Sequence, residues 1–200
     1  MITFDSPILL LDFGGYVTEF RTLTFVGGMQ RAQGNNLRVA LCEMVNGGAK
    51  KITILFSSDG GSPNEAIPLF SFLRALPVEI TMHAIGPVDS LAIPVFLAGK
   101  KRFASKNATF LFHQYNWSYG QPQTDQQSLL RERLAILDSS MNWTVGIVKE
   151  RTKITDADIE SLKLFDHPMI LTSARAAELG LVEQVLEPTI NRDTGPRVVI

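Results

Sequence analysis

The sequence predicts an α/β fold in which short parallel strands alternate with helices and one long helix projects from the body. Apolar, strand-like runs at 52–56, 78–85 and 109–112 are separated by segments with helical spacing. This alternation is typical of stacked strand-and-helix units around a parallel sheet. The amphipathic segment 124–150 would be about 40 Å long as a helix, roughly the diameter of a domain of this size. The 200 residues fit a single domain, 1–200.

Composition indicates a soluble globular protein. Apolar residues make up 45% and charged residues 20%, with a net charge of −1. The sequence contains no long basic or acidic block, so its charge pattern does not indicate nucleic acid or an anionic membrane surface as a partner. The apolar run 7–12 is too short to span a bilayer. The one cysteine, Cys42, lies among apolar residues and is expected to be a reduced core residue, which favours a cytoplasmic location.

The N-terminal part begins with a strand and a helix. Residues 1–15 carry no clear pattern, whereas the segment 16–26 is rich in Thr, Phe and Val and predicts a strand. Apolar residues then recur at helical spacing over 37–45. Asn35 or Asn36 is expected to cap this helix.

A second strand-and-helix unit follows. The short apolar strand 52–56 enters a glycine-rich turn, and Ser62, Pro63 and Glu65 have the form of a capping box with proline at the first helical position. Pro68 lies inside the helix that follows, so a kink or a delayed start is expected there.

The segment 124–150 predicts a long helix with an apolar stripe. A helix of this length would project past its own core, and the stripe would then need a partner. The alternative is a helix that lies flat across the domain. Its apolar positions recur at helical spacing: Leu130, Leu134, Leu137, Met141, Val145 and Val148.

Two short helices and a tail complete the chain. Thr155 is expected to cap a helix to about Leu164, and Thr172 or Ser173 to cap another that ends before Gly180. The tail, 187–200, contains two prolines and a glycine and is expected to be peripheral.

Ser90 is the first candidate for chemistry. It lies between the apolar strand 78–85 and a second apolar run at 93–99. A serine on a tight strand-to-helix turn is lifted out of the sheet beside unpaired backbone N–H groups, which is how a nucleophile is presented. The alternative is that Ser90 simply caps the helix.

Two further motifs surround Ser90. The segment 57–62 reads Ser-Ser-Asp-Gly-Gly-Ser, and 110–114 reads Phe-Leu-Phe-His-Gln. With these motifs in this order, residues 52–185 resemble the Clp-type serine peptidases, the proteolytic subunits of Clp proteases, which have a crotonase-like fold. That family has a Ser-Pro-Gly-Gly-Ser turn, a nucleophile within Ile-Gly-x-x-x-Ser, and a base at the end of an apolar strand.

The resemblance implies Ser90 as nucleophile and His113 as base. It also implies an oxyanion hole built from the backbone N–H groups of Gly61 and Leu91, because glycine permits close approach of substrate and the first helical turn leaves N–H groups free. Of the other histidines, His83 lies inside a strand and is expected in the core, and His167 lies in a polar turn and is expected in solvent.

The third triad member is assigned by the resemblance to Asp166. Counting forward from 150–152 reaches Asp166, whereas counting back from 171–173 reaches Pro168, and two additional residues in 167–170 reconcile the counts. Asp156 and Asp158 are the alternatives, although carboxylates at a helix start are expected for capping.

Three residues depart from the family's pattern. Asp59 replaces the proline before the double glycine, Asp89 replaces a small residue before the nucleophile, and Tyr115 replaces the proline after His-Gln. A carboxylate at position 89 would oppose oxyanion charge unless it points away.

Taken together, the resemblance implies a serine endopeptidase that cleaves unfolded polypeptides inside a chamber of stacked homo-oligomeric rings. In that family the segment 124–150 is the handle helix that joins two rings. The reaction needs no metal or organic cofactor, and an ATP-dependent unfoldase would be the partner. Two alternatives remain: a non-catalytic ring subunit, which Asp59, Asp89 and Tyr115 favour, and a crotonase-type acyl-coenzyme A enzyme.

Overall fold

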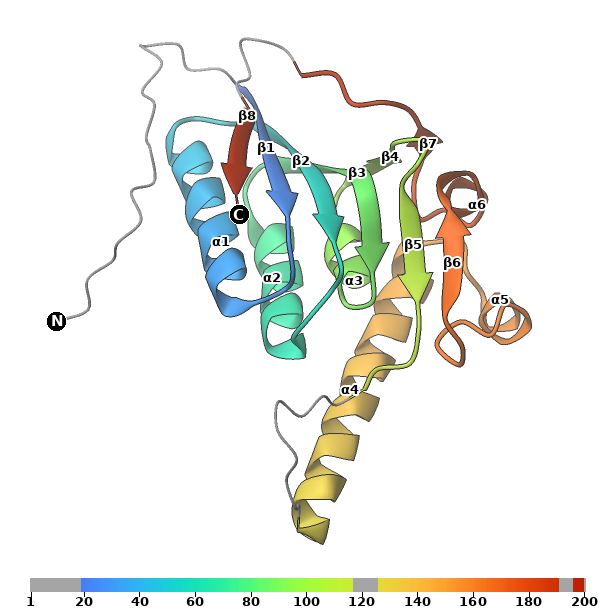
Figure 1. Ribbon diagram of the computed structural model, residues 1–200. Helices are drawn as coiled ribbons and strands as arrows, with labels where there is room; N and C mark the ends of the chain where they lie inside the picture. The colour runs from blue at the N-terminus through green and yellow to red at the C-terminus, as the bar shows by residue number, and fades with distance from the viewer. Residues whose placement is uncertain (1–18, 117–125, 191–195, 200) are drawn as a thin grey trace, which may run out of the picture.

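The computed structural model describes residues 19–116, 126–190 and 196–199, and its secondary structure confirms the predicted α/β class (Figure 1). The helices are α1 (Arg31–Asn46), α2 (Pro63–Ala75), α3 (Ala92–Phe96), α4 (Gln127–Arg151), α5 (Asp156–Ser161) and α6 (Ser173–Glu178). The strands are β1 (Phe20–Val26), β2 (Lys51–Ser58), β3 (Glu79–Asp89), β4 (Lys101–Ala104), β5 (Thr109–Phe112), β6 (Met169–Thr172), β7 (Gln184–Val185) and β8 (Pro196–Val199).

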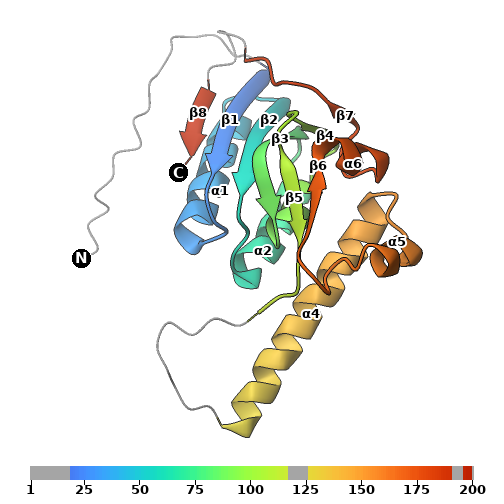
Figure 2. The same ribbon diagram turned by 45° about the vertical axis from the view of Figure 1, so that its right-hand side comes forward.

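One mostly parallel sheet organises these elements. Its strands follow the order β6-β5-β3-β2-β1-β8, and β4 pairs with both β3 and β7. Only the β5–β6 pairing is antiparallel among the described strands. Helices α1, α2 and α3 lie together on one face of the sheet (Figures 1 and 2). The carboxyl ends of β2, β3 and β5 consequently meet along one edge, where the loops carry the residues of interest.

A line of aromatic rings crosses the core from β1 to β5. Phe25 stacks on Phe56 at 5.5 Å, Phe56 lies 6.2 Å from Phe96, and Phe96 meets Phe110 edge-on at 5.4 Å. All four are fully buried. Because large aromatic side chains dominate core energetics, this line fixes α3 against the sheet and with it the turn that precedes α3.

Helix α1 begins earlier than expected. It starts at Arg31, so Asn35 and Asn36 lie within the helix, and Gln30 occupies the N-cap position without a side-chain cap. The prediction that Cys42 lies in the core is wrong, because its side chain is exposed. The residues of α1 that face the core are Gly34, Leu37, Leu41 and Met44, and position 42 lies off that stripe.

At the start of helix α2, one side of the predicted capping box is present, the cap by the Ser62 side chain. The Ser62 hydroxyl accepts a hydrogen bond from the Asn64 N–H at 3.2 Å. Glu65 is buried and turns instead to α1, where its carboxylate meets the Arg38 guanidinium at 3.0 Å. The helix runs continuously from Pro63 through Pro68, so the delayed start does not occur.

Helix α4 projects beyond the sheet, as Figures 1 and 2 show, and the alternative of a flat helix is wrong. It has 25 residues and is described from Gln127, while positions 124 and 125 lie outside the described residues. Its buried residues, Ser140 to Val148, all lie in the C-terminal half. In the N-terminal half, Leu130 is 50% and Leu134 58% exposed. The apolar stripe therefore divides into a covered part and an open part.

Arginine side chains fix the C-terminal end of α4. Arg151 donates to the carbonyls of Leu97 and Gly99 at 3.1 and 3.0 Å. Arg102 donates to the Arg151 carbonyl at 3.0 Å and to the Leu181 carbonyl at 2.8 Å. These bonds tie the last turn of α4 to the α3–β4 loop and hold the C-terminal end of the projecting helix.

The C-terminal segment returns to the far edge of the sheet. Within the tail 187–200, residues 196–199 form β8, which pairs in parallel with β1. Among the described helices, none combines the length and apolar character needed to cross a membrane.

Candidate active site

Ser90 occupies a strained turn between β3 and α3. Its φ of 57° is in the left-handed region, which residues with a side chain rarely adopt. Its N–H donates to the Leu111 carbonyl at 2.8 Å, and its own carbonyl accepts from Ile93 at 3.0 Å. The N-cap position of α3 is held by Leu91, not by Ser90. Strain of this kind persists only where surrounding bonds hold it, and it is common at functional sites.

The double glycine lies directly against this turn. A Cβ on Gly60 would come within 2.8 Å of both the Asp89 carbonyl and the Ser90 Cβ, and its φ is +87°. A Cβ on Gly61 would come within 2.6 Å of the Met29 carbonyl oxygen, with φ at +147°. Both positions therefore require glycine, for the close approach and for the backbone angle.

A β-bridge holds the glycine turn in place. Met29 N–H donates to the Gly60 carbonyl at 2.6 Å, and Ser62 N–H donates to the Met29 carbonyl at 3.0 Å. The Gly61 N–H is neither of these two donors, so the bridge does not consume it. Leu91 N–H precedes the first hydrogen-bonded turn of α3. These are the two amides assigned to the oxyanion hole by the resemblance.

His113 follows the end of β5 beside the Ser90 turn. Strands β3 and β5 are parallel, with Asp89 paired to Leu111, so Ser90 and His113 leave neighbouring strands at the same edge. The His113 side chain is half-buried. Its Nδ1 lies 2.5 Å from the Gln114 carbonyl oxygen, which can only accept, so Nδ1 carries the proton. Nε2 then has the free lone pair that a general base requires.

The segments that carry Asp166 and His113 lie side by side, but no hydrogen bond joins these two residues in the described part of the chain. The Phe165 ring meets the Phe112 ring edge-on at 5.3 Å, which brings the segments carrying Asp166 and His113 together. Asp166 is exposed, and its N–H donates to the Lys163 carbonyl at 3.1 Å. Within the described residues, no hydrogen bond joins the Asp166 carboxylate to His113.

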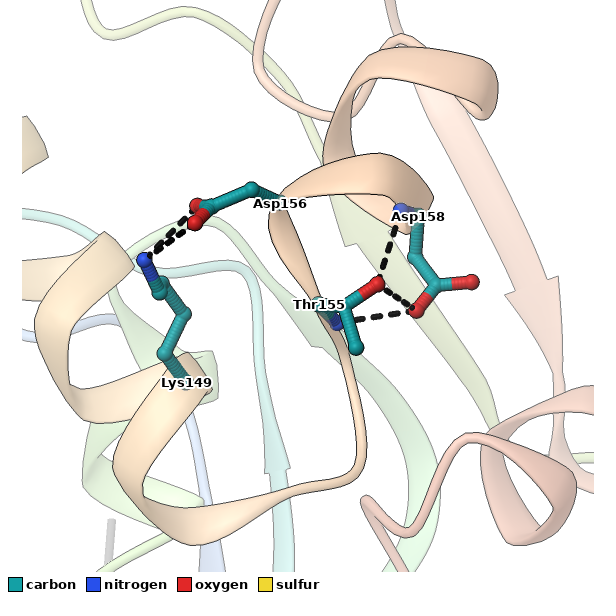
Figure 3. A network of polar contacts seen from close by, with 4 residues as sticks. All are labelled: Lys149, Thr155, Asp156 and Asp158. Carbon is teal, nitrogen blue, oxygen red and sulfur yellow. Dashed lines mark hydrogen bonds and ion pairs between the residues drawn. The ribbon is translucent and has the colours of Figure 1, made fainter.

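The two alternative aspartates are engaged elsewhere (Figure 3). Asp158 completes a capping box, because its carboxylate accepts from Thr155 N–H at 2.8 Å while the Thr155 hydroxyl accepts from Asp158 N–H at 3.2 Å. Asp156 pairs with the Lys149 ammonium at 2.7 Å. The predicted Thr155 cap is confirmed. Both carboxylates stabilise the start of α5 and are engaged in these contacts.

Asp89 is an unusual neighbour for a nucleophile. Its Oδ1 is buried and has no hydrogen-bond partner among the described residues. Burial raises the pKa of Asp89 above its usual value, and the charge of Asp59 raises it further, while a backbone bond from Leu111 and the proximity of His113 oppose the shift. Asp89, which replaces the family's small residue before the nucleophile, therefore places a carboxyl group in a poorly solvated position.

The other two histidines are where the sequence places them. His83 is 3% exposed, its Nε2 lies 3.0 Å from the Leu186 carbonyl oxygen, and burial lowers its pKa. His167 is exposed. Both predictions are confirmed, and His113 is the histidine that lies at the Ser90 edge.

Tyr115 turns away from solvent toward α4. Its hydroxyl lies 2.6 Å from the Thr144 Oγ1, and its ring meets the His113 ring edge-on at 6.4 Å. Sequence reasoning identified Tyr115 as a departure but missed Thr144. The sequence signal for Thr144 was weak: it is a hydroxyl residue that lies between the apolar positions Met141 and Val148.

Comparisons with known proteins identify the family of this chain. The family model described as Clp protease matches residues 14–189. A curated relative, the ATP-dependent Clp protease proteolytic subunit 1 of Rhodococcus jostii (strain RHA1), is 28% identical over 141 residues. That match covers 69% of this chain and 61% of the relative, so the chain spans less than two thirds of the relative's length. The parallel sheet with its helices is consistent with the crotonase-like fold of that family. The chain belongs to the Clp protease family.

Proposed function

We propose that this protein is a serine endopeptidase that cleaves unfolded polypeptides. The observation that carries the proposal is the strained Ser90 turn, packed against Gly60 and hydrogen-bonded to the strand that ends at His113. A positive φ on a serine at the carboxyl edge of a parallel sheet is the geometry of a presented nucleophile.

The chemistry follows from these groups. Ser90 Oγ attacks the peptide carbonyl carbon while its proton passes to His113 Nε2. The carbonyl oxygen becomes an oxyanion that the N–H groups of Gly61 and Leu91 stabilise. His113 then gives the proton to the leaving amine, and the acyl-enzyme on Ser90 forms. Water, deprotonated by His113, then attacks the acyl carbon. When this second intermediate collapses, the bond from the acyl carbon to Ser90 Oγ breaks, His113 returns the proton to Oγ, and the carboxylic acid leaves.

Asp166 is assigned to orient His113 and to stabilise its charged form. The assignment is supported by the Phe112–Phe165 contact, which holds the two segments together. Its carboxylate is exposed in the single chain, and the Nδ1 proton of His113 is donated to the Gln114 carbonyl. The role therefore requires that Asp166 turn toward the imidazole and replace that carbonyl as the acceptor when substrate binds or subunits assemble.

The working form is proposed to be a stack of homo-oligomeric rings that encloses the active sites. Leu130 and Leu134, exposed on the free half of α4, supply the apolar surface for ring-to-ring contact. Substrates would be unfolded chains delivered by an ATP-dependent unfoldase. The Rhodococcus jostii relative is named as a subunit of an ATP-dependent protease, which supports an ATP-dependent partner.

A second candidate is a non-catalytic ring subunit, and Asp89 is the observation that favours it. A charged carboxylate beside the oxyanion site would raise the energy of the transition state. Burial raises the pKa of Asp89, so the repulsion is absent where the acid is neutral and develops as the pH rises through its folded-state pKa.

Labelling with a fluorophosphonate separates the candidates. The reagent forms a covalent bond to an activated serine, so we expect mass spectrometry to find one adduct on Ser90 and none in the variants Ser90→Ala and His113→Gln. An unlabelled parent protein would reject the peptidase in favour of a non-catalytic subunit or of an acyl-coenzyme A enzyme, which needs no activated serine.

A further inference from the structure

We propose that Tyr115 is a positioning residue for His113, and that it acts through a buried hydroxyl pair with Thr144 of α4. The inference rests on the proposed role of His113 as base, and it adds two residues that hold the imidazole in place. Tyr115 lies two positions after His113 and is the point at which the chain leaving β5 is attached to α4.

The contact is short and partly buried. The two hydroxyl oxygens are 2.6 Å apart, and Thr144 has no exposed surface. Tyr115 packs against the hydrophobic core. Such a pair contributes more to fixing geometry than a fully exposed one, because the buried Thr144 hydroxyl cannot exchange its partner for water.

Tyr115 cannot itself serve as an acid or base in the working pH range. Burial raises its pKa well above the usual value for a phenol, although the bond to Thr144 opposes the shift. The hydroxyl therefore stays protonated and acts as a permanent donor or acceptor toward Thr144. Its effect on chemistry must pass through another group, and the edge-on ring contact at 6.4 Å identifies His113 as that group.

The attachment point on α4 is itself rigid. Trp143, the neighbour of Thr144, meets the Phe70 ring of α2 edge-on at 5.6 Å. Thr144 thus lies where α4 is still packed on the body, just before the helix leaves the core. A proline at position 115, as in the family's usual motif, has no hydroxyl with which to make this bond. The tyrosine provides a different means of fixing the same segment.

Two readouts test the inference in the protein of 200 residues. The first is the rate at which fluorophosphonate labels Ser90, compared across pH 5 to 9. The second is the rate at which diethyl pyrocarbonate modifies His113, measured by peptide mass spectrometry, with exposed His167 as internal reference and buried His83 as the protected one. The second readout does not depend on catalysis.

Tyr115→Phe and Thr144→Val each remove one hydroxyl with little change of shape. We expect each to slow Ser90 labelling by about 10- to 100-fold, the cost of a displaced catalytic group. Each should also speed His113 modification relative to His167 by about fivefold, as expected for the loss of one hydrogen bond. The double variant should lose no more than either single variant, since both remove the same interaction.

Two controls make the result specific. Ser140→Ala removes another buried hydroxyl of α4, one that donates to the Ile136 carbonyl of its own helix at 2.8 Å, and should leave both readouts unchanged. Thr144→Ser keeps the hydroxyl and should restore both rates. Parental modification of His113 in Tyr115→Phe and Thr144→Val would overturn the inference, as would parental Ser90 labelling. If the parent's Ser90 is never labelled, the peptidase proposal fails instead, and His113 modification alone decides whether Tyr115 positions the ring.

Discussion

The Phe112 and Phe165 rings meet edge-on with centroids 5.3 Å apart, and each is followed directly by a residue of the candidate triad. His113 comes after Phe112 and Asp166 after Phe165. Both rings are buried, and Phe165 has a φ of 72°, so the backbone turns sharply at the residue that makes the contact. The core therefore brings half-buried His113 and exposed Asp166 to the same edge of the molecule.

Asp166→Asn is expected to lower turnover by as much as about 10⁴-fold, because the amide favours the wrong histidine tautomer. The fold should persist, since Asp166 is exposed. Peptide cleavage by the purified variant is the measurement. As controls, Asp156→Asn and Asp158→Asn should retain activity, because their carboxylates contact Lys149 and Thr155 at the start of α5. Near-parental activity in Asp166→Asn would remove this residue from the triad.

Gly60→Ala is expected to distort the Ser90 turn. The new methyl group would collide with the Asp89 carbonyl and the Ser90 Cβ, both 2.8 Å from its ideal position, in a backbone conformation that alanine disfavours. We expect a stability loss of about 1–3 kcal/mol and slower fluorophosphonate labelling. Gly146→Ala, where a Cβ meets nothing within 4 Å, is the matched control and should stabilise α4 by up to about 1 kcal/mol. Equal labelling by the two variants would contradict the packing described here.

Asp89→Asn is expected to stabilise the protein at neutral pH by up to about 1 kcal/mol, because a neutral amide replaces a carboxylate whose charged form is disfavoured by its partial burial. The folded-state pKa of Asp89 is raised, so the native protein binds this proton more tightly than the unfolded chain. Stability is therefore lost as the pH rises through the folded-state pKa. Below the unfolded value of about 3.9 the parent and the variant should be equally stable in this respect.

Urea unfolding at pH 7 and at pH 4 measures the Asp89 effect. Asp59→Asn is the useful comparison, because Asp59 is exposed and acts on Asp89 only through its charge, so its effect should have the same sign and be smaller. A variant Asp89→Asn that is less stable than the parent at pH 7 would show that the carboxylate has a partner in solution.

A charge in the open part of the α4 stripe is expected to break ring stacking. Leu134→Glu places a carboxylate at a position that is 58% exposed in the single chain, and burying it between rings would cost several kcal/mol. Light scattering should then report single rings or smaller species. Ser139→Glu, on an exposed polar position of the same helix, should leave the particle size unchanged. A parent protein that is a stable monomer would contradict the oligomer.

The fold was predictable where the pattern of residues reflects burial. The strand 109–112 and the Thr155 cap were predicted from local sequence, and both are present. The start of α1 was not, because Gln30 holds the N-cap position without any side-chain bond that a pattern could reveal. Glu65 has the right spacing for a capping box, but its ion pair with Arg38 depends on how α1 packs against α2.

In the candidate site too, some features follow from local sequence and others depend on tertiary packing. Ser90 and His113 follow from motifs, and the parallel pairing of β3 with β5 explains why residues 23 positions apart reach one edge. The bond between Tyr115 and Thr144 joins residues 29 positions apart, through the packing of a loop on a helix, and no local spacing encodes it. The burial of the Asp89 carboxylate likewise depends on neighbouring strands.

The central claim is that Ser90 cleaves peptide bonds, and cleavage of an unfolded polypeptide tests it most directly. Fluorescently labelled casein is incubated with the parent protein and with Ser90→Ala, and light scattering confirms that the two have the same particle size. We expect the parent to release fluorescent peptides, and Ser90→Ala to be slower by several orders of magnitude, because a triad without its nucleophile loses nearly all of its rate. Equal rates of peptide release by the two proteins would contradict the account.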